Sequence, residues 1–191
     1  MQQIEDYIKN YFGIRGTDLS PVVQLFEETQ LHKNEHLLKV NNYARSISFI
    51  KTGYLRVFAY DKNGDKEITQ WISSQDTFIT DLSSFVFDTP SRWNIQALSD
   101  CELYTISKEN YHRIGEYVEN WPELKMLFIA KCFVTLEHRV FDQLSMTAEQ
   151  KVKQLLDTNP ELFVQVPLQY IASMLGMTPE TLSRVRRQLL S

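Results

Sequence analysis

The sequence predicts an α+β chain with an N-terminal jelly roll (a double-stranded β-helix), a long dimerisation helix and a C-terminal all-α helix-turn-helix domain. Three observations predict it. Residues 30–107 are rich in aromatic and β-branched residues broken by turn signals, residues 120–144 show helical apolar spacing, and residues 167–191 hold two short amphipathic segments around Gly176. We place the roll with its N-terminal helices at 1–120, the dimerisation helix at 121–145 and the helix-turn-helix domain at 146–191.

Composition indicates a globular protein with a small basic region. The 191 residues carry a net charge of −4, so the whole molecule is not a general polyanion binder. From Thr178 onward, however, three arginines oppose one glutamate, a local charge of 3 − 1 = +2. Cys101 and Cys132 lie far apart without a CxxC pattern, which argues against a disulfide framework or a zinc site and predicts buried thiols in a cytoplasmic protein. We find no signal peptide and no membrane span, and expect no membrane partner.

The first part of the chain predicts helices followed by strands. Helical spacing up to about residue 29 predicts a small lid, with Ser20-Pro21 as a helix start. Asn63-Gly64, between expected strands at 54–60 and 67–71, is the strongest hairpin signal in the chain. Further strands are expected at 93–98 and 102–106. Several short strands at regular spacing favour a jelly roll, which is the usual way to arrange eight of them.

A long helix is expected from about Asn120 to about Leu144, with apolar residues on two sides. One stripe has alternating steps of three and four residues and comprises Met126, Ile129, Phe133, Leu136 and Val140. The other comprises Leu124, Leu127, Phe128, Val134 and Phe141. A helix that is apolar on two sides needs two partners, which we expect to be the roll and the same helix of a second copy. The alternative is a helix enclosed within its own chain.

The last residues predict a DNA-contacting element. Thr147 and Gln150 predict a capping box after a linker at Ser145–Met146, and Thr178 predicts the N-cap of the final helix. Leucine and valine share one side of this helix, and polar residues share the other. Arginine can bond guanine bidentately, glutamate can accept from cytosine, and hydroxyls can bind phosphates. The predicted DNA-binding residues are Thr178, Glu180, Thr181, Ser183, Arg184 and Arg187. The alternative is that this tail docks a protein partner.

In this order of elements, the chain resembles the Crp/Fnr family of bacterial transcription regulators over nearly its full length. The segments that carry the resemblance are KTGYLRVFAYDKNGDKEITQW, ALSDCELYTIS and QYIASMLGMTPETLSRVRRQL. The resemblance implies a cytoplasmic homodimer that binds double-stranded DNA, with a cyclic-nucleotide-binding-like roll and RNA polymerase as a candidate partner. It places Glu180 and Arg184 at base-reading positions, and Thr178 and Thr181 at phosphates. Because the family's two-stranded wing has no counterpart before Ser191, we expect weaker DNA binding at high salt.

The resemblance also defines an effector pocket in the roll. In members that bind cyclic AMP, a Gly-Glu pair and a later Arg-Ser pair hold the ribose and the phosphate, and these fall on Thr80-Asp81 and Ser91-Arg92. Ser91 lacks the guanidinium, and Arg92, one residue along a strand, is expected to point to the opposite face. The sequence therefore predicts no standard cyclic AMP site, and leaves open another small effector or none. A local bulge that turns Arg92 inward is the alternative. The absence of N-terminal cysteines excludes the family's iron–sulfur sensors.

We expect no enzymatic activity and no metal site. The histidines fall in different predicted elements, and His32 and His36, which could share a helix face, have no third ligand nearby in sequence. The chain has no GxSxG, P-loop or GxGxxG pattern. Two hypotheses remain: a dimeric transcription regulator, or a small-ligand-binding or protein-interaction module.

Overall fold

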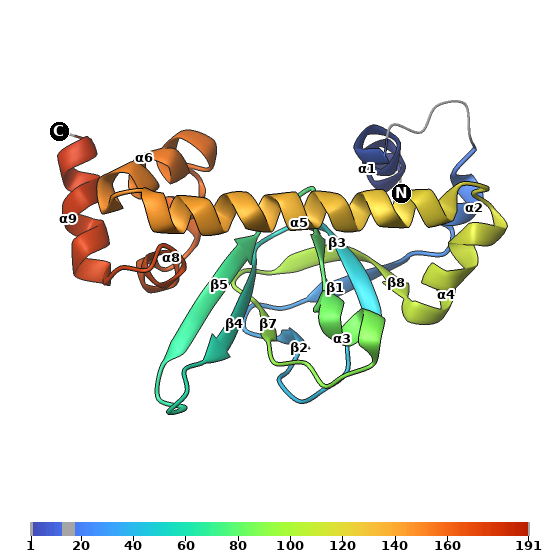
Figure 1. Ribbon diagram of the computed structural model, residues 1–191, viewed down its shortest axis with the longest axis horizontal. Coiled ribbons are helices and arrows are strands. Elements are labelled where there is room, and N and C mark those ends of the chain that lie inside the picture. Colours follow the sequence, from blue (N-terminus) through green and yellow to red (C-terminus); the bar gives the residue numbers. More distant parts are fainter. Residues whose placement is uncertain (1, 13–17, 191) are drawn as a thin grey trace.

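The computed structural model describes residues 2–12 and 18–190. A β-roll lies beneath one long helix, and a cluster of shorter helices sits at the far end of that helix (Figure 1). Residues 13–17, which fall within the segment expected to be helical up to about residue 29, lie outside the described residues.

The roll consists of two antiparallel four-stranded sheets, ordered β1-β8-β3-β6 and β2-β7-β4-β5. Consecutive strands mostly alternate between the sheets, which is the jelly-roll arrangement that the sequence predicts. The mixed architecture of a roll followed by helices is confirmed. The strands are β1 (Glu27–Leu31), β2 (His36–Leu38), β3 (Ser46–Thr52), β4 (Leu55–Tyr60), β5 (Glu67–Ser73), β6 (Phe78–Ile79), β7 (Asn94–Ala97) and β8 (Cys101–Ser107).

The predicted hairpin is present as β4 and β5, joined by residues 61–66. Gly64 adopts a φ of +80°, which a glycine accepts without strain. The backbone N–H of Asp61 donates to the carbonyl of Lys66 at 2.8 Å, and the Asp61 carboxylate accepts from the N–H of Asp65 at 3.0 Å. The side chain of Asp61 therefore closes a loop longer than a two-residue turn.

The helices before the roll are shorter than the sequence indicates. They are α1 (Gln2–Phe12) and α2 (Ser20–Val23), and β1 already begins at Glu27, where a helix was expected to about residue 29. Pairing of all of β1 with residues 101–105 of β8 overrides the helical spacing, and the Thr29 and Thr105 hydroxyls share a hydrogen bond of 2.8 Å across these strands. His32 and His36 consequently lie in a turn and in β2, so they share no helix face.

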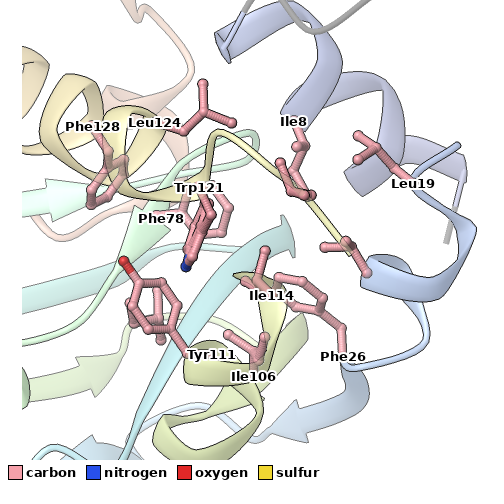
Figure 2. A pocket seen from close by; sticks show the side chains of 13 residues that line it. Ile8, Leu19, Phe26, Phe78, Ile106, Tyr111, Ile114, Trp121, Leu124 and Phe128 are labelled. Atoms are coloured by element: carbon pink, nitrogen blue, oxygen red, sulfur yellow. The ribbon is translucent and has the colours of Figure 1, made fainter. Parts of the chain in front are cut away.

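Helix α3 (Leu82–Phe87) lies between β6 and β7, and α4 (Lys108–Arg113) and a 3₁₀ turn, η1 (Ile114–Glu116), connect β8 to the long helix. Together with α1, α2 and the start of the long helix, α4 and η1 enclose a small apolar cavity of about 50 Å³ (Figure 2). Its lining includes Ile8, Leu19, Ile114 and Leu124, with Trp121 at the centre of the view. The predicted lid therefore closes one end of the roll.

The long helix, α5 (Trp121–Ser145), has 25 residues and spans about 38 Å at 1.5 Å per residue. Its predicted second stripe is only partly covered. Leu124 is buried, and the ring of Phe128 lies 6.0 Å from that of Phe78 on the roll. Leu127, Val134 and Phe141, by contrast, are 45%, 45% and 67% exposed, because the roll contacts a narrower face of the helix than predicted.

The C-terminal helices form a second hydrophobic core. They are α6 (Ala148–Thr158), α7 (Leu162–Gln165), α8 (Leu168–Met174) and α9 (Pro179–Leu189), of which the short α7 was not predicted. The capping box of Thr147 and Gln150 is confirmed, and Gly176 turns the chain between α8 and α9 with a φ of +70°. None of the helices in the described ranges combines the length and the apolar character that crossing a bilayer requires.

Gly53, in the turn between β3 and β4, provides a test of the roll. It has a φ of +95°, and a Cβ there would meet the Asp100 carbonyl and the Cys101 Sγ at 2.6 Å each. We expect Gly53→Ala to lower the free energy of unfolding by about 3 kcal/mol, since backbone strain and a steric clash add. Urea denaturation measures the change.

The matched control is Gly64→Ala, whose φ is also positive but whose Cβ would meet nothing within 4 Å. Strain alone acts there, and a loss of only about 1 kcal/mol is expected. Equal losses in the two variants would contradict the close approach at Gly53.

Candidate nucleic-acid interface and ligand pocket

Helix α9 separates an inward apolar side from an outward polar side. Leu182 and Val185 are 0% and 6% exposed and belong to the core that α6 and α8 share with α9. Glu180, Ser183, Arg184 and Arg187 are exposed on the other side. Thr178 caps the helix by accepting from the N–H of Thr181 at 3.2 Å. The division of the helix that the sequence predicts is therefore present.

The outward side is free to contact a partner. Within the described residues, neither Arg184 nor Arg187 makes a hydrogen bond or an ion pair, whereas Arg186 lies 5.9 Å from the ring of Phe163 on the packed side. Hydrogen bonds from its own backbone N–H and from the Thr178 hydroxyl lower the pKa of Glu180. Its carboxylate is therefore ionised at neutral pH and can accept a hydrogen bond.

The C-terminal helices dock on the roll through a buried arginine that sequence reasoning missed. Arg56 on β4 is 1% exposed; its Nε donates to the Thr69 hydroxyl at 2.8 Å and its guanidinium to Glu67 at 2.6 Å. The guanidinium also lies 4.2 Å from the ring centre of Phe58 and 4.0 Å from that of Tyr170 on α8. The sequence feature that could have identified Arg56 is its place among alternating aromatic residues along a predicted strand.

A hydrogen bond from the sheet edge reinforces this junction. Strand β5 is the last strand of its sheet, and α8 packs against it. The N–H of Thr69 donates to the Ser173 hydroxyl at 3.0 Å. An unpaired donor of the strand is thereby satisfied by a side chain of the helix.

A pocket of about 460 Å³ lies between the roll and α5. Thr80 and Asp81 border it, but both are engaged within the roll. The Thr80 hydroxyl donates to the Ser46 carbonyl at 2.9 Å. The Asp81 carboxylate caps α3 through the N–H of Ser84 and accepts from the Ser91 hydroxyl at 2.7 Å.

The other two predicted pocket residues do not border this pocket. Ser91 is 1% exposed and bonds to Asp81, so the positions that the resemblance assigns to ribose and phosphate are bonded to each other. Arg92 is exposed, and its guanidinium lies 4.4 Å from the ring centre of Trp93. The bulge that would turn Arg92 into the pocket is not formed. Residues 91–93 form a bend ahead of β7, in which the Trp93 N–H donates to the Ser91 hydroxyl at 3.0 Å, so the strand on which Arg92 was expected begins only at Asn94.

The cation in the pocket comes from α5 instead. Arg139 borders the pocket, and its guanidinium carbon lies 3.0 Å from the ring centre of Trp71 on β5. Desolvation by burial lowers the pKa of Arg139 to about 10. The same two side chains border a second cavity of about 260 Å³ beside α6 and α8. There, the Gln143 amide donates to the Met174 carbonyl at 3.1 Å.

No cluster in the described residues groups three or more histidine, cysteine, aspartate or glutamate side chains in a way that could hold a metal ion. Cys101 and Cys132 are both free thiols; Cys101 is buried, as predicted, whereas Cys132 is only partly buried. Burial raises the pKa of each, and this disfavours thiolate formation.

Comparison with known proteins identifies the roll first. Residues 28–116 match the cyclic nucleotide-binding domain and form a domain of that class. The chain as a whole has the fold of Crp/Fnr transcriptional regulators, so the fold that the resemblance implied is confirmed. Among curated proteins, no relative of the chain is found at the sequence level.

Three solved structures illustrate the shared fold. FixK2 from Bradyrhizobium japonicum has a TM-score of 0.72 at 17% identity, over 86% of this chain and 84% of its own. A putative cAMP-binding regulatory protein from Silicibacter pomeroyi has 0.70 at 18% identity, over 99% and 88%. A putative transcriptional regulator of the Crp/Fnr family from Eubacterium rectale has 0.69 at 17% identity, over 97% and 88%.

The contact between Arg56 and Tyr170 can be tested by truncating the ring. Tyr170→Ala is expected to lower the free energy of unfolding by about 2 kcal/mol, since it removes a cation–π contact from a desolvated guanidinium. Urea denaturation measures this loss, and hydrogen exchange should speed up at the Thr69 amide, because α8 no longer holds β5 as closely.

Tyr43→Ala is the control, because Tyr43 lies against Arg45 at 5.1 Å and is 44% exposed. Exposed contacts of this kind contribute about 0.5 kcal/mol. A Tyr170→Ala loss no greater than that of the control would argue against a structural role for the junction.

Proposed function

We propose that the protein is a transcription regulator that binds double-stranded DNA as a homodimer. The observation that carries the proposal is the outward side of α9, where Glu180, Arg184 and Arg187 are exposed and neither arginine has a partner among the residues that the structure describes. Side chains of these types at the start of a recognition helix are suited to base edges in the major groove. Thr178 and Thr181, at the N-terminus of α9, are placed to bond phosphates.

The dimer is supported by apolar side chains on α5 that have no cover within the described chain. Met126, Phe133 and Val140 are 70%, 66% and 51% exposed. They lie on one stripe with alternating steps of three and four, as in a two-helix seam. A contiguous exposed apolar stripe of this kind is typical of an interaction site. A second copy of α5 would bury it and present two α9 helices to one face of DNA.

The effector pocket is not a standard cyclic AMP site in this proposal. A phosphate needs a cation at the position of Ser91, and that residue is neutral, buried and bonded to Asp81. The pocket between the roll and α5 remains available for another small molecule. RNA polymerase stays a candidate partner of the DNA-bound dimer.

Base reading by α9 is tested with Arg184→Ala. On a site selected from random DNA by the intact protein, affinity should fall by about 1–3 kcal/mol, concentrated at one base pair, because one bidentate contact is lost. Fluorescence anisotropy on single-substitution variants of the site measures this. Arg186→Ala serves as the control, since Arg186 leans toward Phe163 and should leave the base preference unaltered. An Arg184→Ala protein with an unchanged base preference would favour docking of a protein partner instead.

Dimerisation through α5 is tested with Phe133→Asp. Burying a carboxylate in the seam costs several kcal/mol, so native mass spectrometry should show a dimer for the intact chain and a monomer for the variant. Val164→Asp is the control, because Val164 is 83% exposed but lies on α7, away from the stripe. A monomeric intact chain, or a dimeric Phe133→Asp variant, would contradict the proposal that the apolar stripe of α5 is the dimer seam.

A further inference from the structure

Arg139 is the cation of the pocket between the roll and α5, and it has no anionic partner in the described chain. The salt bridges there involve other cations, and none of the carboxylates lies within ion-pair distance of its guanidinium. Within the described residues, its guanidinium carbon lies 3.0 Å from the ring centre of Trp71. Burial lowers its pKa to about 10, so the side chain still carries its charge at neutral pH.

A partly desolvated cation without a counter-ion is unfavourable, and an anion beside it relieves that penalty. The Cys132 thiol nearby does not supply one, because burial raises its pKa. Asp81, which also borders the pocket, is directed to the N-terminus of α3 and to Ser91. The anion that fits is therefore one that enters from outside.

The side chains that line the pocket around Arg139 indicate which kind of molecule carries the anionic group. Aromatic side chains from several elements border the pocket: Tyr7 on α1, Trp71 on β5, Phe78 on β6, Trp93 just before β7 and Phe128 on α5. Flat aromatic faces favour planar aromatic ligands through stacking and apolar burial. A volume of about 460 Å³ is within the range of small-molecule sites. A single guanidinium matches one carboxylate, which it can bind bidentately.

Building on the effector pocket of the proposed function, we propose that this pocket binds a planar aromatic monoanion, with Arg139 as the residue that holds its carboxylate. The charge that recognises the ligand is supplied by the long helix, and the aromatic body lies against the roll. A cyclic nucleotide is disfavoured because the Asp81–Ser91 hydrogen bond occupies the groups that would otherwise hold ribose and phosphate.

The test compares two probes that share one ring system and differ in charge, 2-naphthoate and 2-naphthamide. Their affinities for the full chain are measured by ligand-observed NMR titration. The intact protein should bind naphthoate at least about tenfold more tightly than naphthamide, as expected for a charge-assisted hydrogen bond. Arg139→Gln should abolish that preference, and Arg139→Lys, which retains the charge, should keep a preference for naphthoate.

Arg45→Gln is the matched control, because Arg45 also stacks on an aromatic ring but is exposed and lies outside the pocket. It should leave the preference unchanged. Near-UV circular dichroism verifies that the Arg139 variants keep the packing of the intact protein. Failure of naphthoate to bind the intact protein, equal affinities for the two probes, or an unchanged preference in Arg139→Gln would each overturn the proposal.

DNA binding, measured on the same preparations with the selected site, separates this inference from the proposed function. Intact DNA binding without naphthoate recognition overturns the ligand assignment alone. Naphthoate recognition that depends on Arg139, in a protein that binds no DNA, supports the ligand assignment and overturns the regulator.

Discussion

The buried guanidinium of Arg56 is the constraint on which the arrangement of the two parts of the chain depends. A charge that is 1% exposed must find hydrogen bonds and a favourable field within the protein. Glu67 and Thr69 satisfy it from the neighbouring strand, and the ring centres of Phe58 and Tyr170 lie 4.2 and 4.0 Å from it. Since Tyr170 belongs to α8, solvation of this one charge within the roll is completed only by the C-terminal helices. Displacing the C-terminal helices exposes Arg56 to water, which then solvates its guanidinium in place of Tyr170.

Helix α5 connects the pocket, the exposed apolar stripe and the C-terminal helices that we propose for DNA contact. Arg139 faces the pocket, and Gln143, one turn further along the same side, holds the carbonyl of Met174 at the end of α8. Leu136, which borders the same pocket, belongs to the exposed stripe. A molecule in the pocket would thus touch a helix that also carries the stripe proposed as the seam between two copies and the side chain that bonds the end of α8. These contacts form a continuous physical route between the sites.

The parts that the sequence predicted best are those determined locally. The Thr147 capping box, the Thr178 N-cap, the positive φ of Gly176 and the hairpin at Gly64 depend on a few neighbouring residues, and all are present. The predictions that failed depended on tertiary contacts. Helical spacing before residue 29 gives way to pairing of β1 with β8, and the width of the α5 face that the roll covers could not be read from periodicity.

The candidate sites show the same division. The two faces of α9 follow from helical spacing, so the exposed residues were predictable. Family resemblance placed Thr80 and Asp81 at the pocket, but Ser91 turned out to be a hydrogen-bonding partner of Asp81, and Arg92 lies outside. Arg139 was missed because it lies within a helix whose apolar residues dominated the pattern, and its approach to Trp71 joins residues distant in sequence.

The position of β5 at the margin of its sheet has a consequence for solubility. Its outer backbone groups would be a template for strands of other molecules if they were left open, and α8 covers them, with Ser173 accepting from Thr69. The helices that we propose for DNA contact therefore also act as a guard against intermolecular β-pairing. Any state in which these helices move off β5 exposes its edge to pairing with strands of other molecules. Such a state is best protected from aggregation when bound DNA or a second subunit keeps the exposed edges of different molecules apart.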